Sequence, residues 1–163
     1  MADLPHSDIM RLITAANEAR AGAPATIRSA DAERQLEAYF RVSHALAVYG
    51  TLAPGCPNHH VVAPLGGAWT AGAVEGDLAP SGWGAALGYP AFHPRPGGPS
   101  VAVQVLHSSA LPDAWPRLDA FEGSEYRRIL VPVWAPGGTT GRQLLTVANL
   151  YAAVPRDRDD AAR

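Results

Sequence analysis

One acidic residue, Glu122, is placed where a carboxyl could transfer protons. It lies near the end of the segment Leu118-Asp119-Ala120-Phe121-Glu122-Gly123, which continues a run of apolar residues at three-residue steps, typical of one face of a helix. The C-terminal end of a helix disfavours negative charge, and Trp115, Phe121 and Tyr126 provide apolar surroundings close by in the sequence. A carboxyl in such surroundings has a raised pKa and can act as a general acid and base.

The same residue also has a simpler interpretation. Most charged side chains in proteins are solvated, and Arg127 and Arg128 follow Glu122 closely enough to form a surface ion pair with it. Taken alone, the segment therefore leaves both a catalytic and a surface glutamate open.

A second segment, Val48-Tyr49-Gly50-Thr51-Leu52, combines an apolar strand with a glycine and a small hydroxyl residue. Glycine lets the backbone turn sharply and lets a ligand approach the main chain closely. Successive free N–H groups at such a turn form a concave site for an anion or an oxyanion. An ordinary junction between a strand and a turn has the same residues, so this segment alone does not decide its role.

Composition excludes several other kinds of catalysis. All 13 basic residues are arginine, which rules out a Schiff-base lysine and a phosphate-loop lysine. The only cysteine, Cys56, excludes an intrachain disulfide and a thiolate-rich metal site. None of the six histidines has a partner at a ligand-like spacing, and neither a G-x-S-x-G serine motif nor a G-x-G-x-x-G nucleotide loop occurs. We therefore expect no metal and no cofactor.

The overall size and charge limit the kinds of partner. A chain of 163 residues corresponds to one ordinary domain, and a net charge of −2 does not suit a nucleic-acid binder. No apolar run reaches the roughly 18 to 20 residues that span a bilayer, and the first residues lack the order of a signal peptide. We expect a soluble cytoplasmic protein without nucleic-acid or membrane partners.

The first 43 residues are predicted to form two helices, separated by a break at residues 22–24. Ser7 is expected to cap the first helix, and the second is expected to begin near Ser29. The acidic residues expected in its first turn are Asp31 and Glu33, and the residues expected in its buried stripe are Leu36, Tyr39 and Phe40. This extension is expected to pack on the remaining domain, as a dimer arm, a lid or additional packing.

Beyond residue 43 the pattern changes to short strands with one embedded helix. Strands are predicted at 45–49, 71–78, 101–105, 126–134 and 144–153, with an irregular strand or loop at 83–92, a helix at 111–122 and a hairpin turn at 136–138. Pro132 favours an edge strand or a bulge. The order predicts an α+β fold or a small β-barrel with helices outside. Residues 44–155 are the expected domain, and 156–163 form a charged, mobile tail.

Four short motifs follow one another in a characteristic order. They are Tyr49-Gly50-Thr51-Leu52 with Asn58 after the turn, Tyr89-Pro90, Leu118 to Gly123 with Tyr126 and Arg128, and Asn149-Leu150-Tyr151. Together, over about residues 45 to 153, they resemble the gamma-glutamyl cyclotransferase-like family, which includes the gamma-glutamylamine cyclotransferases. Four motifs in order are much more specific than one.

The resemblance implies a small mixed β-barrel flanked by helices, with one pocket at its mouth. It implies that Glu122 is the catalytic residue, and that Tyr49, Gly50, Thr51, Leu52 and Tyr126 bind the substrate. The implied reaction needs no metal or cofactor and releases 5-oxoproline from a small gamma-glutamyl amine or peptide by intramolecular attack.

Three points stay open beside this resemblance. Family members often have Gly-Glu-Val-Tyr in a strand before the catalytic helix, whereas this chain has Val103-Gln104-Val105-Leu106. A non-catalytic small-molecule-binding or regulatory protein of the same fold is the alternative function, because a fold alone does not determine activity. A homodimer is compatible with the sequence.

Overall fold

The computed structural model describes residues 3–24, 26–79, 91–137 and 142–154. The helices are α1 (His6–Arg20), α2 (Ile27–Phe40) and α4 (Leu111–Glu122), with short 3-10 turns η1 (Val42–His44), η2 (His59–Val61) and η3 (Ala63–Leu65). The strands are β1 (Ala45–Val48), β2 (Ala68–Ala79), β3 (Ala91–Pro94), β4 (Ser100–His107), β5 (Tyr126–Trp134) and β6 (Leu144–Ala153). Of these described helices, none is long and apolar enough to cross a membrane. The segment 83–90, which includes Tyr89-Pro90, as well as Gly138 and the tail 156–163, lies outside the described residues.

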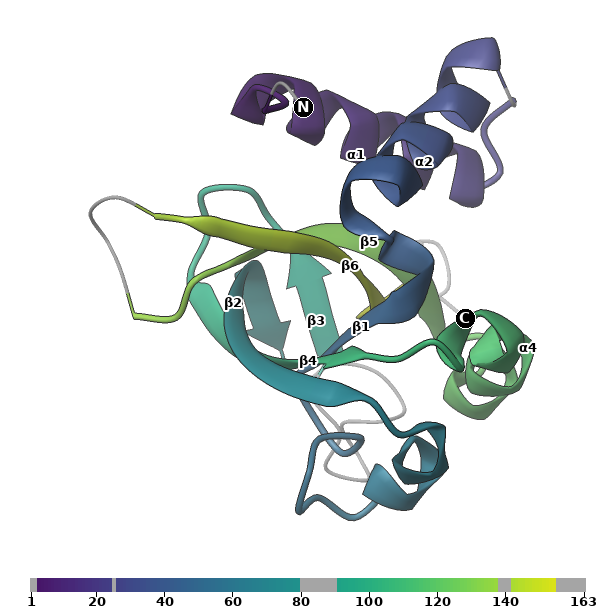
Figure 1. Cartoon of the computed structure of the whole chain (residues 1–163), viewed down its shortest axis with the longest axis vertical. Coiled ribbons are helices and arrows are strands. Elements are labelled where there is room, and N and C mark those ends of the chain that lie inside the picture. The colour runs from purple at the N-terminus through teal and green to yellow at the C-terminus, as the bar shows by residue number, and fades with distance from the viewer. Residues whose placement is uncertain (1–2, 25, 80–90, 138–141, 155–163) are drawn as a thin grey trace, which may run out of the picture.

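Five strands close into a mixed barrel, and β3 extends it beyond β2. The hydrogen-bonded order is β3-β2-β4-β1-β6-β5, and Ala73 of β2 pairs with Trp134 of β5 to close the ring. β1 and β6 run parallel, whereas the other pairs are antiparallel. Figure 1 shows α1 and α2 together on one side of this barrel and α4 at another. The expected α+β fold, a small mixed barrel flanked by helices, is therefore confirmed.

The closure of the barrel depends on a close approach between β2 and β5. A Cβ atom at Gly72 would lie 2.5 Å from Cγ1 of Val133, so only glycine fits there. On the β5 side, the register shifts between Val133 and Trp134. Pro132 lies one residue before this irregularity, and among the described residues β5 is bridged to β2 only at Trp134, so Pro132 lies beside a bulge on a sparsely paired edge, as predicted.

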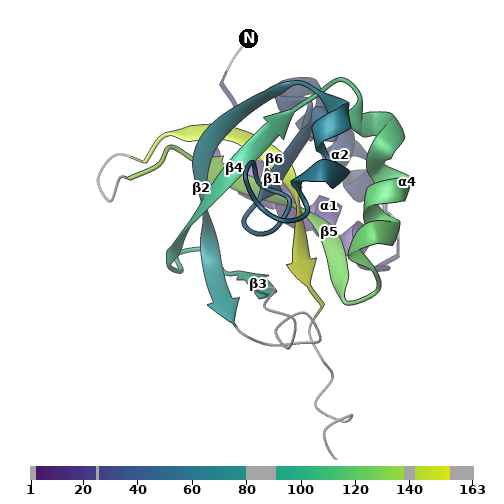
Figure 2. The same ribbon diagram turned by 90° about the horizontal axis from the view of Figure 1, so that it is seen from below.

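The alternation of side chains along β1 positions the helix that carries Glu122. Ala45 and Ala47 belong to the cluster inside the barrel, whereas Leu46 and Val48 belong to a second cluster outside it. That second cluster includes Leu111, Ala114, Trp115 and Leu118 of α4. α4 is thus held against the barrel wall, and Figure 2 shows it beside the barrel with the loop after β1 lying in front of the strands.

The two N-terminal helices pack on β5 and β6, and their beginnings differ from the sequence prediction. α1 begins at His6, where the main-chain oxygen of Pro5 accepts from Asp8 and Ile9, so Ser7 lies inside the helix and does not cap it. α2 begins at Ile27 because Thr26 is its cap. The Thr26 side chain accepts from the Ser29 N–H at 3.1 Å, and the Ser29 hydroxyl accepts from the Thr26 N–H at 2.9 Å.

This earlier start changes which residues of α2 are buried. Asp31 and Glu33 lie beyond the first turn, which contains no acidic residue. Leu36 is fully buried as expected, but Phe40 is half-buried and Tyr39 is exposed. Tyr39 is exposed because the stripe that faces the barrel repeats at Ser29, Ala32 and Leu36. The cluster beneath the two helices holds Ile9, Ile13, Ala16, Ala32, Leu36, Val42, Leu130 and Val147.

Candidate active site

A cavity of about 320 Å³ opens where β1 ends, between the following loop and the last turn of α4. Its volume is in the range of small-molecule sites. It is lined by Ala47, Val48, Tyr49, Gly50, Thr51, Leu52, Asn58, Phe121, Glu122, Tyr126 and Tyr151. The two segments singled out in the sequence therefore meet, and Glu122 lines the same cavity as the five residues expected to contact a substrate.

The loop after β1 turns tightly and is braced from within. The Ala53 N–H donates to the Gly50 oxygen at 3.2 Å, and the Asn58 N–H donates to the Thr51 oxygen at 2.9 Å. The Asn58 side chain also donates to Thr51 Oγ1 at 3.0 Å. None of the hydrogen bonds among the described residues uses the N–H groups of Gly50, Thr51 or Leu52 as donors. All three residues line the cavity, so their main-chain donors are available to bind a developing negative charge there.

Glu122 reaches the cavity because it is the last residue of α4. Pro112 lies in the first turn of the helix, and Gly123 follows its last residue at φ +80°, a backbone conformation that favours glycine. Burial raises the pKa of Glu122 to about 7. Arg128 pairs with Asp119 at 2.9 Å, and among the described residues no arginine pairs with Glu122. The surface ion pair considered from the sequence is therefore absent from the described part of the chain.

Three tyrosines surround Glu122 and remain protonated at neutral pH. Burial, and to a smaller extent the charge of Glu122, raise the pKa of Tyr49, Tyr126 and Tyr151 above their usual value. The Tyr49 hydroxyl donates to the Tyr151 main-chain oxygen at 2.8 Å. Among the side chains lining this cavity, Glu122 is therefore the one suited to gain and lose a proton near pH 7.

Some residues lie elsewhere than the sequence suggested. Trp115 does not line the cavity, because it lies under the Arg128 guanidinium, 4.5 Å away, and donates to the Ser43 oxygen at 3.0 Å. Gln104 is exposed on β4 and Leu106 is buried in the cluster outside the barrel, so the departure from the Gly-Glu-Val-Tyr pattern does not alter the cavity lining.

The cavity also has lining residues that the sequence analysis did not assign to a site. Phe121, Asn58 and Tyr151 are the polar and aromatic members of this group. All three occur in the matched motifs, and this was the signal that could have identified them. The described residues contain no group of three or more histidine, cysteine or acidic side chains that could hold a metal ion.

The raised pKa of Glu122 predicts a measurable stability change. The folded chain binds the Glu122 proton more tightly than the unfolded chain does. The protonated carboxyl therefore stabilises the fold fully below pH 4.5, the ordinary pKa of glutamate, and this contribution is lost as the pH rises to about 7. The loss amounts to about 3 kcal/mol. Glu122→Gln removes this dependence, so urea unfolding should show the variant gaining stability relative to the parent protein between pH 4.5 and 7. A difference that stays constant over this range would contradict burial of the carboxyl.

Comparison with known proteins complements this geometry. A family model described as gamma-glutamyl cyclotransferase, AIG2-like, matches residues 46–162. A solved AIG2-like protein from Mus musculus is 23% identical, with a TM-score of 0.52 over 71% of this chain and 80% of that chain. An uncharacterized protein from Pyrococcus horikoshii is 21% identical, with a TM-score of 0.49 over 70% of this chain and 80% of that chain. No curated protein matches the sequence. The mouse structure shares the fold of this chain.

Proposed function

Because the chain belongs to the gamma-glutamyl cyclotransferase, AIG2-like family, we propose that it releases 5-oxoproline from a gamma-glutamyl amine or peptide. One observation carries this proposal: Glu122, whose pKa is raised by burial to about 7, lines the same cavity as Gly50, Thr51 and Leu52, and the main-chain N–H groups of these three residues donate to no other described residue. The cavity thus combines a proton carrier with donors for an oxyanion, the two functions that acyl transfer requires.

The first step joins two atoms of the same substrate. The α-amine of the glutamyl group is protonated near neutrality, and ionised Glu122 accepts a proton from it. The amine nitrogen then attacks the γ-carbonyl carbon, and a new C–N bond closes a five-membered ring. Because attacking and attacked atoms belong to one molecule, holding the substrate folded supplies much of the rate.

The second step releases the leaving group. The tetrahedral intermediate carries an oxyanion, which accepts hydrogen bonds from the main-chain donors of the Gly50–Leu52 loop. Glu122 returns its proton to the leaving nitrogen as the original C–N bond breaks. The attacking nitrogen then gives up its second proton to Glu122, which is ionised again, and becomes the lactam N–H. Glu122 passes this proton to the released amine, so the products are 5-oxoproline and the amine in its ammonium form, and no water is consumed.

The proposed function is tested by incubating the protein with a panel of gamma-glutamyl amino acids, peptides and amines, and measuring 5-oxoproline by mass spectrometry. We expect release from at least one member, together with an equal amount of the free amine. Absence of product from every member would contradict the proposal. If substrates then raised the melting temperature without turnover, the protein would be a small-molecule-binding or regulatory protein of the same fold.

We also propose that this enzyme works in the cytoplasm as a homodimer without a cofactor, with residues 1–43 as a helical extension and 44–155 as the enzymatic domain. Sedimentation tests the oligomeric state. Fluorescence microscopy of the tagged protein tests the location.

A further inference from the structure

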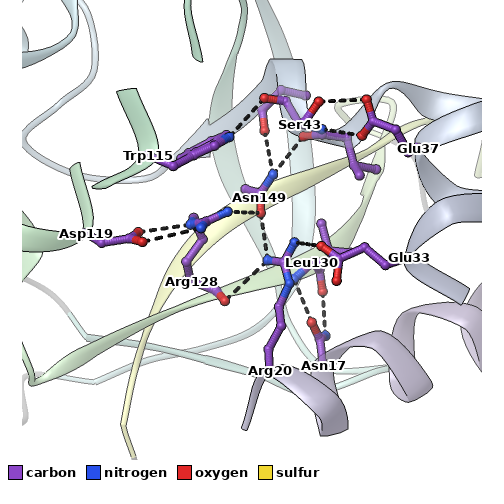
Figure 3. A network of polar contacts seen from close by, with 12 residues as sticks. Asn17, Arg20, Glu33, Glu37, Ser43, Trp115, Asp119, Arg128, Leu130 and Asn149 are labelled. Atoms are coloured by element: carbon purple, nitrogen blue, oxygen red, sulfur yellow. Dashed lines mark hydrogen bonds and ion pairs between the residues drawn. The ribbon is translucent and has the colours of Figure 1, made fainter. Parts of the chain in front are cut away.

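A continuous polar network joins the N-terminal helix α1 to the wall of the cavity. Figure 3 shows it running from Arg20 through Asn149 and Arg128 to Asp119. Arg20 comes from α1, outside the residues matched by the family model, which begins at residue 46. Its side chain is 16% exposed, forms an ion pair with Glu33 of α2, and donates from Nη1 to Asn149 Oδ1 at 2.8 Å.

Asn149 is the junction of this network. It is fully buried on β6, and its Oδ1 accepts both from Arg20 and from Arg128 Nη1, the latter at 3.3 Å. An amide oxygen has two lone pairs, and in Asn149 each of them accepts a hydrogen bond from one arginine. Its Nδ2 donates to the Val42 oxygen at 2.7 Å. The amide therefore fixes two guanidinium groups relative to each other and to the barrel.

The network ends on a tyrosine of the cavity wall. Arg128 donates to Asp119 from Nε at 2.9 Å and from Nη2 at 3.3 Å, and Asp119 accepts from the Tyr151 hydroxyl at 2.6 Å. Burial opposes the charge of Asp119, but the hydrogen bonds from Arg128 and Tyr151, with a smaller contribution from the charge of Arg20, lower its pKa. Asp119 is therefore ionised at neutral pH and holds the Tyr151 hydroxyl proton.

The attachment of α1 to the barrel does not depend on Arg20 alone. The Asn17 side chain donates to the Leu130 oxygen and accepts from the Leu130 N–H, both at 2.8 Å. It thus forms the same pair of hydrogen bonds with the main chain of β5 that a neighbouring strand would form. Ile9, Ile13 and Ala16 are buried in the cluster beneath the two helices. Removing the Arg20 head group thus tests the network while other contacts keep α1 in place.

We propose that Arg20 is a positioning residue for the active site, which acts through Asn149, Arg128 and Asp119 to fix the side chain of Tyr151 in the cavity wall. Tyr151 forms two hydrogen bonds that fix it: its hydroxyl donates to Asp119, and its main-chain oxygen accepts from the Tyr49 hydroxyl. Without Arg20, one acceptor site of Asn149 is empty, Arg128 is less constrained, and Asp119 loses a nearby positive charge. The effect on catalysis rests on the proposed function, whereas the fixing of the tyrosine does not.

The test is a double-mutant cycle with Arg20→Met, Tyr151→Phe and the double variant, in which kcat and KM are measured on the best gamma-glutamyl substrate. Each single variant is expected to lower kcat/KM about tenfold, and the double variant no further than the larger single effect, because both remove the same constraint. Losses that multiply to about a hundredfold would show independent roles and overturn the proposal.

Arg34→Met is the matched control. Arg34 lies on α2, is 74% exposed and pairs only with Asp31 among the described residues, so its loss removes an arginine from the same pair of helices without touching the network. We expect its kcat/KM to stay within about twofold of the parent value. A tenfold loss in this control would show that any weakening of the helical pair lowers activity, which would overturn the specific role of Arg20.

A second readout does not depend on turnover. NMR spectra of tyrosine-labelled protein, with the Tyr151 signal identified by its loss in Tyr151→Phe, should show this signal shifted in Arg20→Met and unchanged in Arg34→Met. An unshifted Tyr151 signal would overturn the proposal even if activity changed. If the parent protein released no 5-oxoproline, the proposed function would fail while this measurement still decided the role of Arg20. Arg20→Gln replaces the methionine variant if that variant does not fold.

Discussion

Glu122→Gln is expected to lower kcat for 5-oxoproline release by about 10²- to 10⁴-fold, the usual contribution of a general acid and base. Glutamine has nearly the same size and shape, so it occupies the same place at the end of α4 but cannot carry a proton. The loss should appear in kcat rather than in KM, because the carboxyl acts on protons that move during the reaction. Steady-state kinetics with the best substrate of the panel measure both constants.

The neighbouring Glu125 provides the control for this variant. It is exposed, lies three residues away and does not line the cavity, so Glu125→Gln should leave kcat unchanged. Glu122→Gln is expected to be at least as stable as the parent above pH 7, because it removes a half-buried ionised carboxyl, and urea unfolding of the variant verifies this. A Glu122→Gln protein with parental activity would remove Glu122 from the mechanism.

The pH profile gives an independent check on Glu122. Since the ionised carboxyl accepts the first proton and burial raises its pKa to about 7, kcat/KM of the parent should rise with pH up to that value. With an exposed glutamate, the rise of kcat/KM would instead be centred near pH 4.5. A profile that is flat from pH 7 down to pH 4 would show that this carboxyl does not control the reaction.

Asn149→Leu is expected to lower the free energy of unfolding by about 2 to 4 kcal/mol, because two charged donors that keep their carboxylate partners lose hydrogen bonds to a buried acceptor. Leucine fills a similar volume, but Arg20 and Arg128 lose their shared acceptor, and the Val42 oxygen loses a donor at 2.7 Å. For a chain of this length the loss corresponds to roughly 10 °C in Tm. Urea unfolding gives the free energy, and calorimetry gives Tm.

Gln104→Leu is the matched change on the neighbouring part of the barrel. Gln104 is an exposed amide on β4, so its replacement should alter the stability by no more than about 0.5 kcal/mol. If Asn149→Leu were equally mild, the network in Figure 3 would contribute little to folding. Reversible two-state unfolding should be verified first, because both free energies depend on it.

The amino-acid sequence by itself was sufficient to place five of the six described strands, the helix that ends at Glu122 and the order of motifs that indicates the family, but it did not place β3. These features are local. Apolar periodicity, Pro112 at the start of α4 and Gly123 after its end act within a few residues of one another. The sequence also singled out the loop from Tyr49 to Leu52, because a glycine after a short apolar run is visible without any tertiary contact.

Tertiary structure alone decided the features that depend on residues far apart in the chain. Burial of Glu122, which sets its pKa, arises because the loop after β1 packs against the end of α4, about seventy positions away in sequence. Arg20 and Asn149 are separated by 129 positions, and their hydrogen bond leaves no periodic signal in the sequence. Such contacts exist only after the barrel closes, since desolvation and hydrogen-bond geometry depend on distances that no local pattern specifies.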